Sequence, residues 1–196
     1  METIVAIGVA IGLSAACGFR VFVPPLAIGL LHSTGHIELS ESFYWMSSPV
    51  ALIAFGSATV LEIVAYFVPF VDNVLDTVAS PAAVVAGTVV SASVMTDVSP
   101  FVQWSLAAIM GVGVTAPVQA ATAATRGVLT LTTAGIGNPV FSAGEVVGAG
   151  AMTILGVFSP IVALAIALFM VGGSFFMLRF GLRKIREKRA VRQNDP

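Results

Sequence analysis

The feature that most constrains this sequence is a series of apolar runs, each long enough to cross a lipid bilayer as a helix. Hydrophobic residues make up 57% of the 196 residues, and charged residues make up only 10%. A soluble globular domain carries about 25% charged residues, and a helix needs about 20 apolar residues to cross the hydrocarbon core. The runs and the composition together predict an all-α integral membrane protein.

Turn signals divide the apolar runs into about six transmembrane helices. We expect these helices at Ile4–Leu31, Pro49–Val68, Phe70–Met95, Trp104–Leu131, Pro139–Phe158 and Pro160–Leu178. Three of them contain internal prolines, at Pro24-Pro25, Pro81 and Pro117. Because proline lacks a backbone donor and clashes with the preceding turn, these positions predict proline-broken helices, or kinks that serve packing alone.

The basic residues predict the orientation in the membrane. Seven of the nine Lys and Arg residues lie between Arg179 and Arg192, and basic residues beside a span mark its cytoplasmic side. The longest polar connection, His32–Ser48, contains no Lys or Arg and suits the outer side. We therefore expect a multi-pass protein of the plasma (inner) membrane, with cytoplasmic N- and C-termini and a basic cytoplasmic tail at residues 181–196. Aromatic residues, which prefer the membrane interface, fall at the predicted outer ends at Phe43, Tyr44, Trp45, Phe101 and Trp104.

The chain divides into two similar halves, residues 1–98 and 99–180. Each half has an arginine in its long first helix and a glutamate in its shorter second helix, namely Arg20 and Glu62, then Arg126 and Glu145. With three spans in each half, the second copy must be inverted in the membrane. Inverted repeats underlie many transporter folds, so we expect two inverted three-helix repeats.

Polar and small residues recur along single faces of the predicted helices, at spacings of three and four. These stripes contain Thr115, Gln119, Thr122 and Arg126; Asn138, Ser142, Glu145, Ala149 and Thr153; Asp72, Asp76, Ser80, Ala83, Gly87 and Ser91; and Ala51, Ala58, Glu62 and Ala65. Such spacing places residues on one side of a helix. Because polar groups are costly in lipid, we expect the stripes to face one another, either as a hydrogen-bonded packing interface or as a functional site.

The charged members of these stripes predict a candidate ion site. At 1.5 Å of rise per residue, one layer in the cytoplasmic half contains Glu62, Asp72, Asp76, Arg126 and Glu145. One arginine does not neutralise four carboxylates, and clustered carboxylates in a low dielectric suit proton or cation exchange. The alternative is a structural ion pair of Arg126 with Glu145 or Glu62.

Arg20 is expected apart from this layer, nearer the midplane. Its guanidinium could bind an anion through its planar donor fork, or it could bond carbonyl groups that the adjacent prolines free. The full set of candidate binding or coupling residues is Arg20, Glu62, Asp72, Asp76, Gln119, Arg126, Asn138, Ser142 and Glu145.

Several other functions find no support in the sequence. A single cysteine, Cys17, excludes an internal disulfide and a cysteine-rich metal site. His32 and His36 are four residues apart, but the intervening Gly35 favours a solvated loop over a metal site. No phosphate-binding loop, zinc-protease motif or nucleophile elbow is present. We expect no enzyme activity, cofactor, metal or nucleic-acid partner.

Two Gly-X-X-X-Gly pairs, Gly8–Gly12 and Gly144–Gly148, permit close approach of helices. They serve either internal packing or a homodimer.

Several motifs resemble a bacterial family of small membrane proteins that is catalogued only as a domain of unknown function. They are Gly18-Phe19-Arg20 before the proline pair, Glu62 followed by Val71-Asp72-Asn73 and Asp76, and Gly137-Asn138-Pro139-Val140 with Ser142 and Glu145. The resemblance covers nearly the whole chain and implies a polytopic membrane protein, with nothing about its substrate. Ser80-Pro81 departs from the pattern, where a basic residue before the proline is expected, so the acidic layer is less neutralised here.

The sequence as a whole favours a small membrane transporter or channel for an ion or small solute, with the carboxylate and arginine cluster as its coupling or ion site. The alternative is a non-transporting scaffold or lipid-binding protein whose buried charges are structural.

Overall fold

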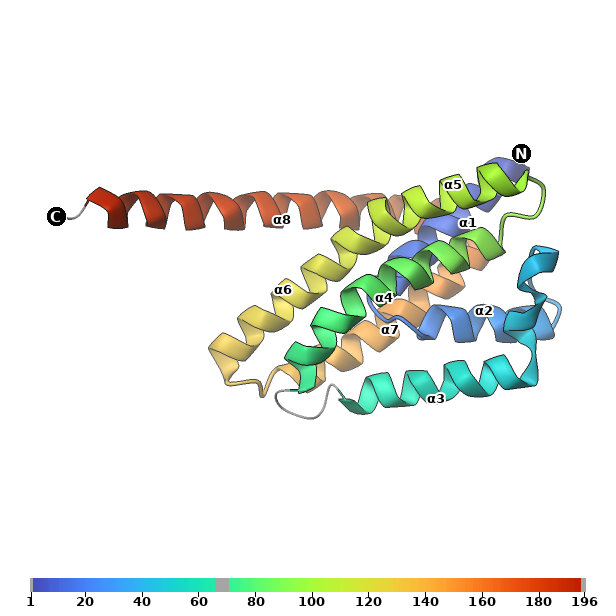
Figure 1. Cartoon of the computed structure of the whole chain (residues 1–196), viewed down its shortest axis with the longest axis horizontal. Helices are drawn as coiled ribbons and strands as arrows, with labels where there is room; N and C mark the ends of the chain where they lie inside the picture. The colour runs from blue at the N-terminus through green and yellow to red at the C-terminus, as the bar shows by residue number, and fades with distance from the viewer. Residues whose placement is uncertain (1, 66–70, 195–196) are drawn as a thin grey trace.

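The computed structural model describes residues 2–65 and 71–194, with side chains at 5–65, 77–177 and 179, and its regular structure is entirely helical (Figure 1). The all-α class is therefore confirmed for this part of the chain. The elements are α1 Glu2–Cys17, α2 Val23–Ser33, η1 Glu41–Ser47, α3 Pro49–Ala65, α4 Val71–Ser93, α5 Pro100–Met110, η2 Gly111–Thr115, α6 Ala116–Thr133, α7 Asn138–Phe158 and α8 Pro160–Asn194.

The described residues contain three helical stretches that are long and apolar enough to cross a membrane. They are Pro100–Thr133, which joins α5, η2 and α6, then Asn138–Phe158 and Pro160–Met177. The η1 and α3 helices, bent by 62° at a short break, form a fourth candidate. Shorter apolar helices cover Val5–Cys17, Val23–Ser33 and Thr77–Ser93. The described residues thus contain three or four candidate spans, whereas the sequence predicts six. The number six stays a prediction.

The first predicted span, Ile4–Leu31, is wrong as a single helix. The chain leaves the helix after Cys17 and starts a new one at Val23, with prolines in the first positions of α2. Proline is favoured there because its missing N–H would have no partner in the helix anyway. The pair Pro24-Pro25 therefore opens a helix instead of kinking one. Figure 1 shows α2 running back toward the end of the bundle from which α1 came.

The other internal prolines leave their helices continuous. Pro81 lies inside the 23-residue helix α4. Pro117 follows the π-helical turn η2, and wider turns of this kind relieve the clash that proline makes with the preceding turn. Gly87 and Gly111 let α4 approach this turn, because a Cβ on either would collide with Thr115 or Thr88, respectively.

Helix α1 packs against α4, α7 and α8. The Oγ atoms of Ser14 and Ser91 lie 2.6 Å apart, and Thr115 Oγ1 donates to the Ser14 carbonyl over 2.7 Å. A Cβ on Gly8 would meet Pro160, and a Cβ on Gly12 would meet Ala163. This glycine pair therefore serves internal packing.

The second glycine pair lies differently. A Cβ on Gly148 would contact the ring of Phe19, whereas nothing lies within 4 Å of a Cβ on Gly144. A homodimer through this pair stays a prediction.

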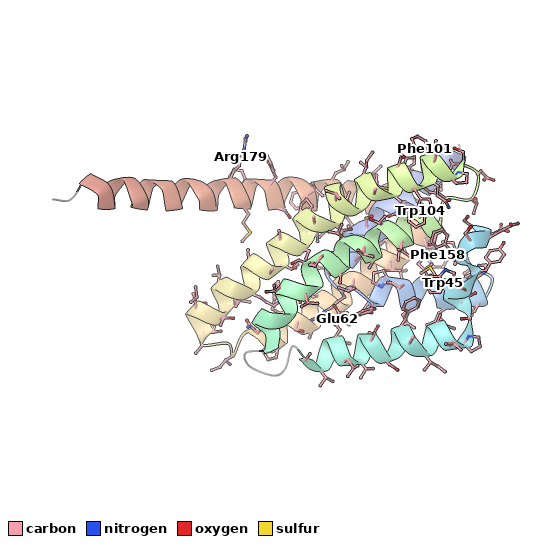
Figure 2. The ribbon with its side chains drawn as sticks, in the orientation of Figure 1. Trp45, Glu62, Phe101, Trp104, Phe158 and Arg179 are labelled. Carbon is pink, nitrogen blue, oxygen red and sulfur yellow. The ribbon has the colours of Figure 1, made fainter. Side chains whose placement is uncertain are left out.

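Aromatic side chains gather at one end of the bundle, as expected. Figure 2 shows Trp45, Phe101, Trp104 and Phe158 there, and Arg179 on the part of α8 that leads away from it. The N- and C-termini lie at opposite ends of the long axis (Figure 1). The membrane side of each terminus stays a prediction.

The directions of the helices bear on the expected inverted repeat. The second and third helices of the two halves run in opposite directions, α3 against α7 and α4 against α8 (Figure 1). The first helices do not correspond, because α1 is followed by a reversal whereas α5 continues into α6. The inverted repeat therefore stays a prediction.

Close packing around α1 predicts an effect of a single methyl group. A Cβ on Gly12 would lie 2.9 Å from Ala163 Cβ and 3.1 Å from Gly156 Cα. Overpacking a tight core costs about 1–3 kcal/mol, so we expect Gly12→Ala to lower the midpoint of thermal unfolding in detergent. The control is Gly150→Ala in α7, where nothing lies within 4 Å of the new Cβ. A midpoint for Gly12→Ala equal to that of Gly150→Ala would contradict the packing argument.

Candidate functional site

Glu145 lies at the centre of a buried cluster of charged side chains. Its Oε1 accepts from Arg126 Nη2 over 2.7 Å, and its Oε2 accepts from Arg20 Nη2 over 3.2 Å. The three side chains are at most 2% exposed. One carboxylate of α7 therefore binds guanidinium groups from α6 and from the segment that follows α1. Of the two carboxylates expected as partners of Arg126, Glu145 makes this ion pair.

Arg20 belongs to the cluster, which corrects the expectation that it stands apart near the midplane. Its Nη2 also donates to the Ser142 carbonyl oxygen over 3.0 Å and to Ser142 Oγ. The expectation assumed a continuous helix through residue 20, whereas the chain reverses at residues 18–22 and carries the arginine to α7. The Ser142 carbonyl that Arg20 binds belongs to α7.

Glu62 holds the start of α2 from the facing helix α3. Its Oε1 accepts from the main-chain N–H of Val21 over 2.9 Å, and its Oε2 accepts from that of Phe22 over 3.2 Å. The first N–H groups of a helix have no partner within the helix and carry partial positive charge. The carboxylate, which is 8% exposed, therefore binds the main-chain donors of the two residues just before α2. Figure 2 shows Glu62 on the side of α3 that faces the bundle.

Other predicted site residues surround the cluster in two groups. Gln119 and Thr122 are buried on α6, and Thr122 Oγ1 donates to the carbonyl of Gly18 over 3.4 Å, at the end of α1. Asn138 begins α7 and donates from Nδ2 to Thr130 Oγ1 over 2.8 Å. Gln119 thus lies beside the helix break, whereas Asn138 lies near the loop that joins α6 to α7.

Asp72 and Asp76 fall in the first turns of α4, and their side chains lie outside the described residues. Among the described charges, two arginines face two glutamates. The expected acidic excess depends on Asp72 and Asp76 as well and therefore stays a prediction.

A cavity reaches one edge of this site. It has a volume of about 460 Å³ and is lined by residues of α3 and α4, Glu62 among them, and by Val21 and Phe22 from the break. The ion pairs of Glu145 lie deeper in the bundle. Access to the charged groups from this side therefore leads through Glu62 and the two main-chain amides that it binds.

No group of His, Cys, Asp and Glu side chains suited to a metal ion occurs among the residues that the structure describes. His32 makes a 3.0 Å hydrogen bond with the carbonyl of Ile37 and stacks on Tyr44. His36 contacts Thr34 over 2.9 Å and the ring of Phe158. His32 therefore lies in the last turn of α2 and only His36 in the loop after it, and both side chains have structural contacts.

Comparison with known proteins identifies a family. The model of the family described as a domain of unknown function (DUF4126) matches residues 7–180, which include every residue of the charged cluster. No curated protein and no solved structure matches the chain.

The shared carboxylate predicts strong coupling between buried charges. Removal of one partner of a buried ion pair costs about 3–5 kcal/mol, so we expect Glu145→Gln to lower the free energy of unfolding in detergent by this order. In an Arg126→Gln background the same substitution should cost less, because one of the two stranded cations is already removed. Glu38→Gln, an identical change at an exposed loop position, is the control. Strictly additive effects at residues 126 and 145 would contradict the coupling.

Proposed function

We propose that this chain, which belongs to the family of the domain of unknown function DUF4126, is a small proton-coupled membrane transporter for an ion or small solute. One observation carries the proposal. The α1–α2 helix pair is interrupted inside the bundle, and buried charged side chains from α3 and α7 hold the interruption in place.

The energetics of a membrane interior support a functional origin for this interruption. Non-helical backbone in lipid is tolerated only where protein or a cavity surrounds it, and buried charges are costly unless they are paired. Broken helices near the centre of the bilayer form the binding sites of many transporters. In this chain the break and the charges occur together, at residues 18–22.

Glu62 is the proton-accepting group in this proposal. As a carboxylate it offers only acceptors to the amides of Val21 and Phe22, whereas the protonated acid carries an O–H donor. Protonation therefore weakens the attachment of α2 to α3, since one oxygen loses its charge-assisted hydrogen bond. The resulting motion of α2 would open the cluster from the side of the cavity that Glu62 lines.

Arg20, Glu145 and Arg126 form the substrate-facing part of the site. A single carboxylate binds two guanidinium groups, so an anion or a second negative group that approaches Arg20 competes with Glu145 for it. Ser142 orients Arg20 through its main-chain and side-chain oxygens. Gln119 and Asn138 supply neutral polar groups at the edges of this site.

The alternative is a non-transporting membrane scaffold or lipid-binding protein. The burial of Arg20, Arg126 and Glu145, each at most 2% exposed, favours it, because sealed ion pairs also fasten helices together. The flux measurement below separates the two functions.

The orientation in the membrane follows from the charges at the two ends of the bundle. The basic residues between Arg179 and Arg192 place the C-terminus in the cytoplasm. The aromatic end, with Glu38, Glu41 and Asp97, then lies outside. Because α1 and α2 form a hairpin, the N-terminus lies on this outer side as well, at the end opposite the C-terminus (Figure 1).

Proton flux tests the proposed function. Purified protein is reconstituted into vesicles that contain a pH-sensitive dye, and gradients of Na⁺, K⁺, Mg²⁺, phosphate and small carboxylates are imposed in turn. We expect at least one gradient to drive proton movement faster than in protein-free vesicles. Glu62→Gln should reduce that movement to the protein-free rate, because the amide carries no exchangeable carboxyl proton.

The matched control is Glu38→Gln, which makes the same change on the exposed loop and should retain the wild-type rate. If no gradient drives proton movement above that of protein-free vesicles, the transport proposal is wrong and the scaffold is favoured. Equal rates for Glu62→Gln and the wild type would remove Glu62 from the mechanism.

Accessibility labelling tests the orientation. In a Cys17→Ala background, Thr34→Cys and Ile136→Cys place single thiols in exposed loops at opposite ends of the bundle. We expect a membrane-impermeant maleimide to label Thr34→Cys in intact spheroplasts, and Ile136→Cys only after permeabilisation. An epitope before Met1 should be accessible from outside and one after Pro196 only after lysis. Accessibility of both epitopes from the same side would overturn the proposed orientation.

A further inference from the structure

A continuous apolar groove runs along the bundle between α3 and α4. Two adjoining hollows of about 510 and 460 Å³ form it, and they share Val21, Phe22, Val78 and Ala82 in their walls. The first hollow extends to Trp45, and the second ends at Glu62 and Ala65 on α3. We refer to this feature, from Trp45 to Ala65, as the α3–α4 groove.

The α3–α4 groove has a distinct rim and floor, which separates it from an ordinary lipid-facing helix surface. Leu61, Val78 and Val85 stand at the rim with 62–68% of their surface exposed. Met46 and Ala79, at 0% and 9% exposed, form part of the floor. Alanines on both flanking helices leave the space between the rims unfilled.

The α3 wall of the groove is about as long as one hydrocarbon chain in a bilayer. It runs from Phe55 to Ala65, ten residue steps or about 15 Å at the rise of an α-helix. Half of the ~30 Å hydrocarbon core is the same distance. Trp45 closes the outer end, among the aromatic residues at that end of the bundle (Figure 2). Such rings lie at the level of lipid headgroups.

The lining of the groove suits hydrocarbon. Glu62 is the one charged residue in its described walls, and its carboxylate oxygens are directed to the main-chain N–H groups of Val21 and Phe22. The surface offered to an occupant therefore consists of aliphatic and aromatic groups. A polar solute gains no hydrogen bonds along it, whereas a methylene chain makes close dispersion contacts with its walls.

We propose that the α3–α4 groove is a binding site for one hydrocarbon chain of a membrane phospholipid, with the headgroup at the level of Trp45 and the chain end beside Glu62. The chain then packs against Val21 and Phe22, the residues that Glu62 holds. A bound chain would therefore pack against the lipid-facing side of the irregular segment between α1 and α2. This site does not depend on the proposed transport function.

Photochemical labelling tests the site. The full chain is reconstituted in vesicles of phosphatidylcholine that carries a diazirine in the middle of one acyl chain, and the labelled peptides are identified by mass spectrometry after irradiation. We expect labels to concentrate on the groove-facing residues of α3 and α4, such as Ala58 and Ala82, above the level on the lipid-facing side of α8. An even distribution of labels over all lipid-facing helices of the wild-type protein would overturn the proposal.

Variants that fill the groove provide the second measurement. Ala58→Phe and Ala82→Phe each place a ring in the groove, and we expect either to reduce the labelling of the opposite wall several-fold. Ala108→Phe adds the same ring at an exposed position of α5 outside the groove and should leave that labelling unchanged. Unchanged labelling in both filled variants would show that no single lipid chain occupies it.

Discussion

The constraint on which the rest of the structure depends is that charges buried among apolar helices must be paired. Glu145 pairs with two arginines at once, at 2.7 Å and 3.2 Å, and thereby joins α7 to α6 and to the segment after α1. Pairing at this depth fixes where Arg20 must lie. A helix that continued straight after Cys17 would carry Arg20 past its partner, so the reversal of the chain and the ion pair require each other.

The reversal creates a second requirement, which α3 meets. Breaking a helix exposes main-chain donors that lipid cannot satisfy, and Glu62 accepts from the two of them at Val21 and Phe22. Both glutamates thus act on the same short segment, one through an arginine side chain and the other through the backbone. The proline pair that follows adds no further unsatisfied donors, because prolines have none.

The sequence predicts the faces of the helices better than their course. The stripes on α6 and α7 are buried as expected, because a period of 3.6 residues and the cost of polar groups in lipid leave one arrangement. Hydropathy gives no such guidance for Ile4–Leu31, since a hairpin of two apolar helices has the same composition as one long span. The preference of proline for the first turn of a helix, together with Gly18 before Arg20, is the signal that favours a new helix at Val23. The same error separated Arg20 from the cluster that contains Glu145.

Stability alone gives a weak reason for this arrangement. Buried ion pairs are often replaced by apolar residues of similar volume without loss of stability, and an unbroken helix would need neither Arg20 nor an external cap. What the break adds is a segment, Val21 and Phe22, that contacts Glu62 on one side and the apolar groove on the other. A displacement of α2 must therefore break the hydrogen bonds to Glu62 and, at the same time, change the shape of the groove wall. This mechanical link gives a change at the carboxylate a route to the rest of the bundle, which a rigid scaffold does not require.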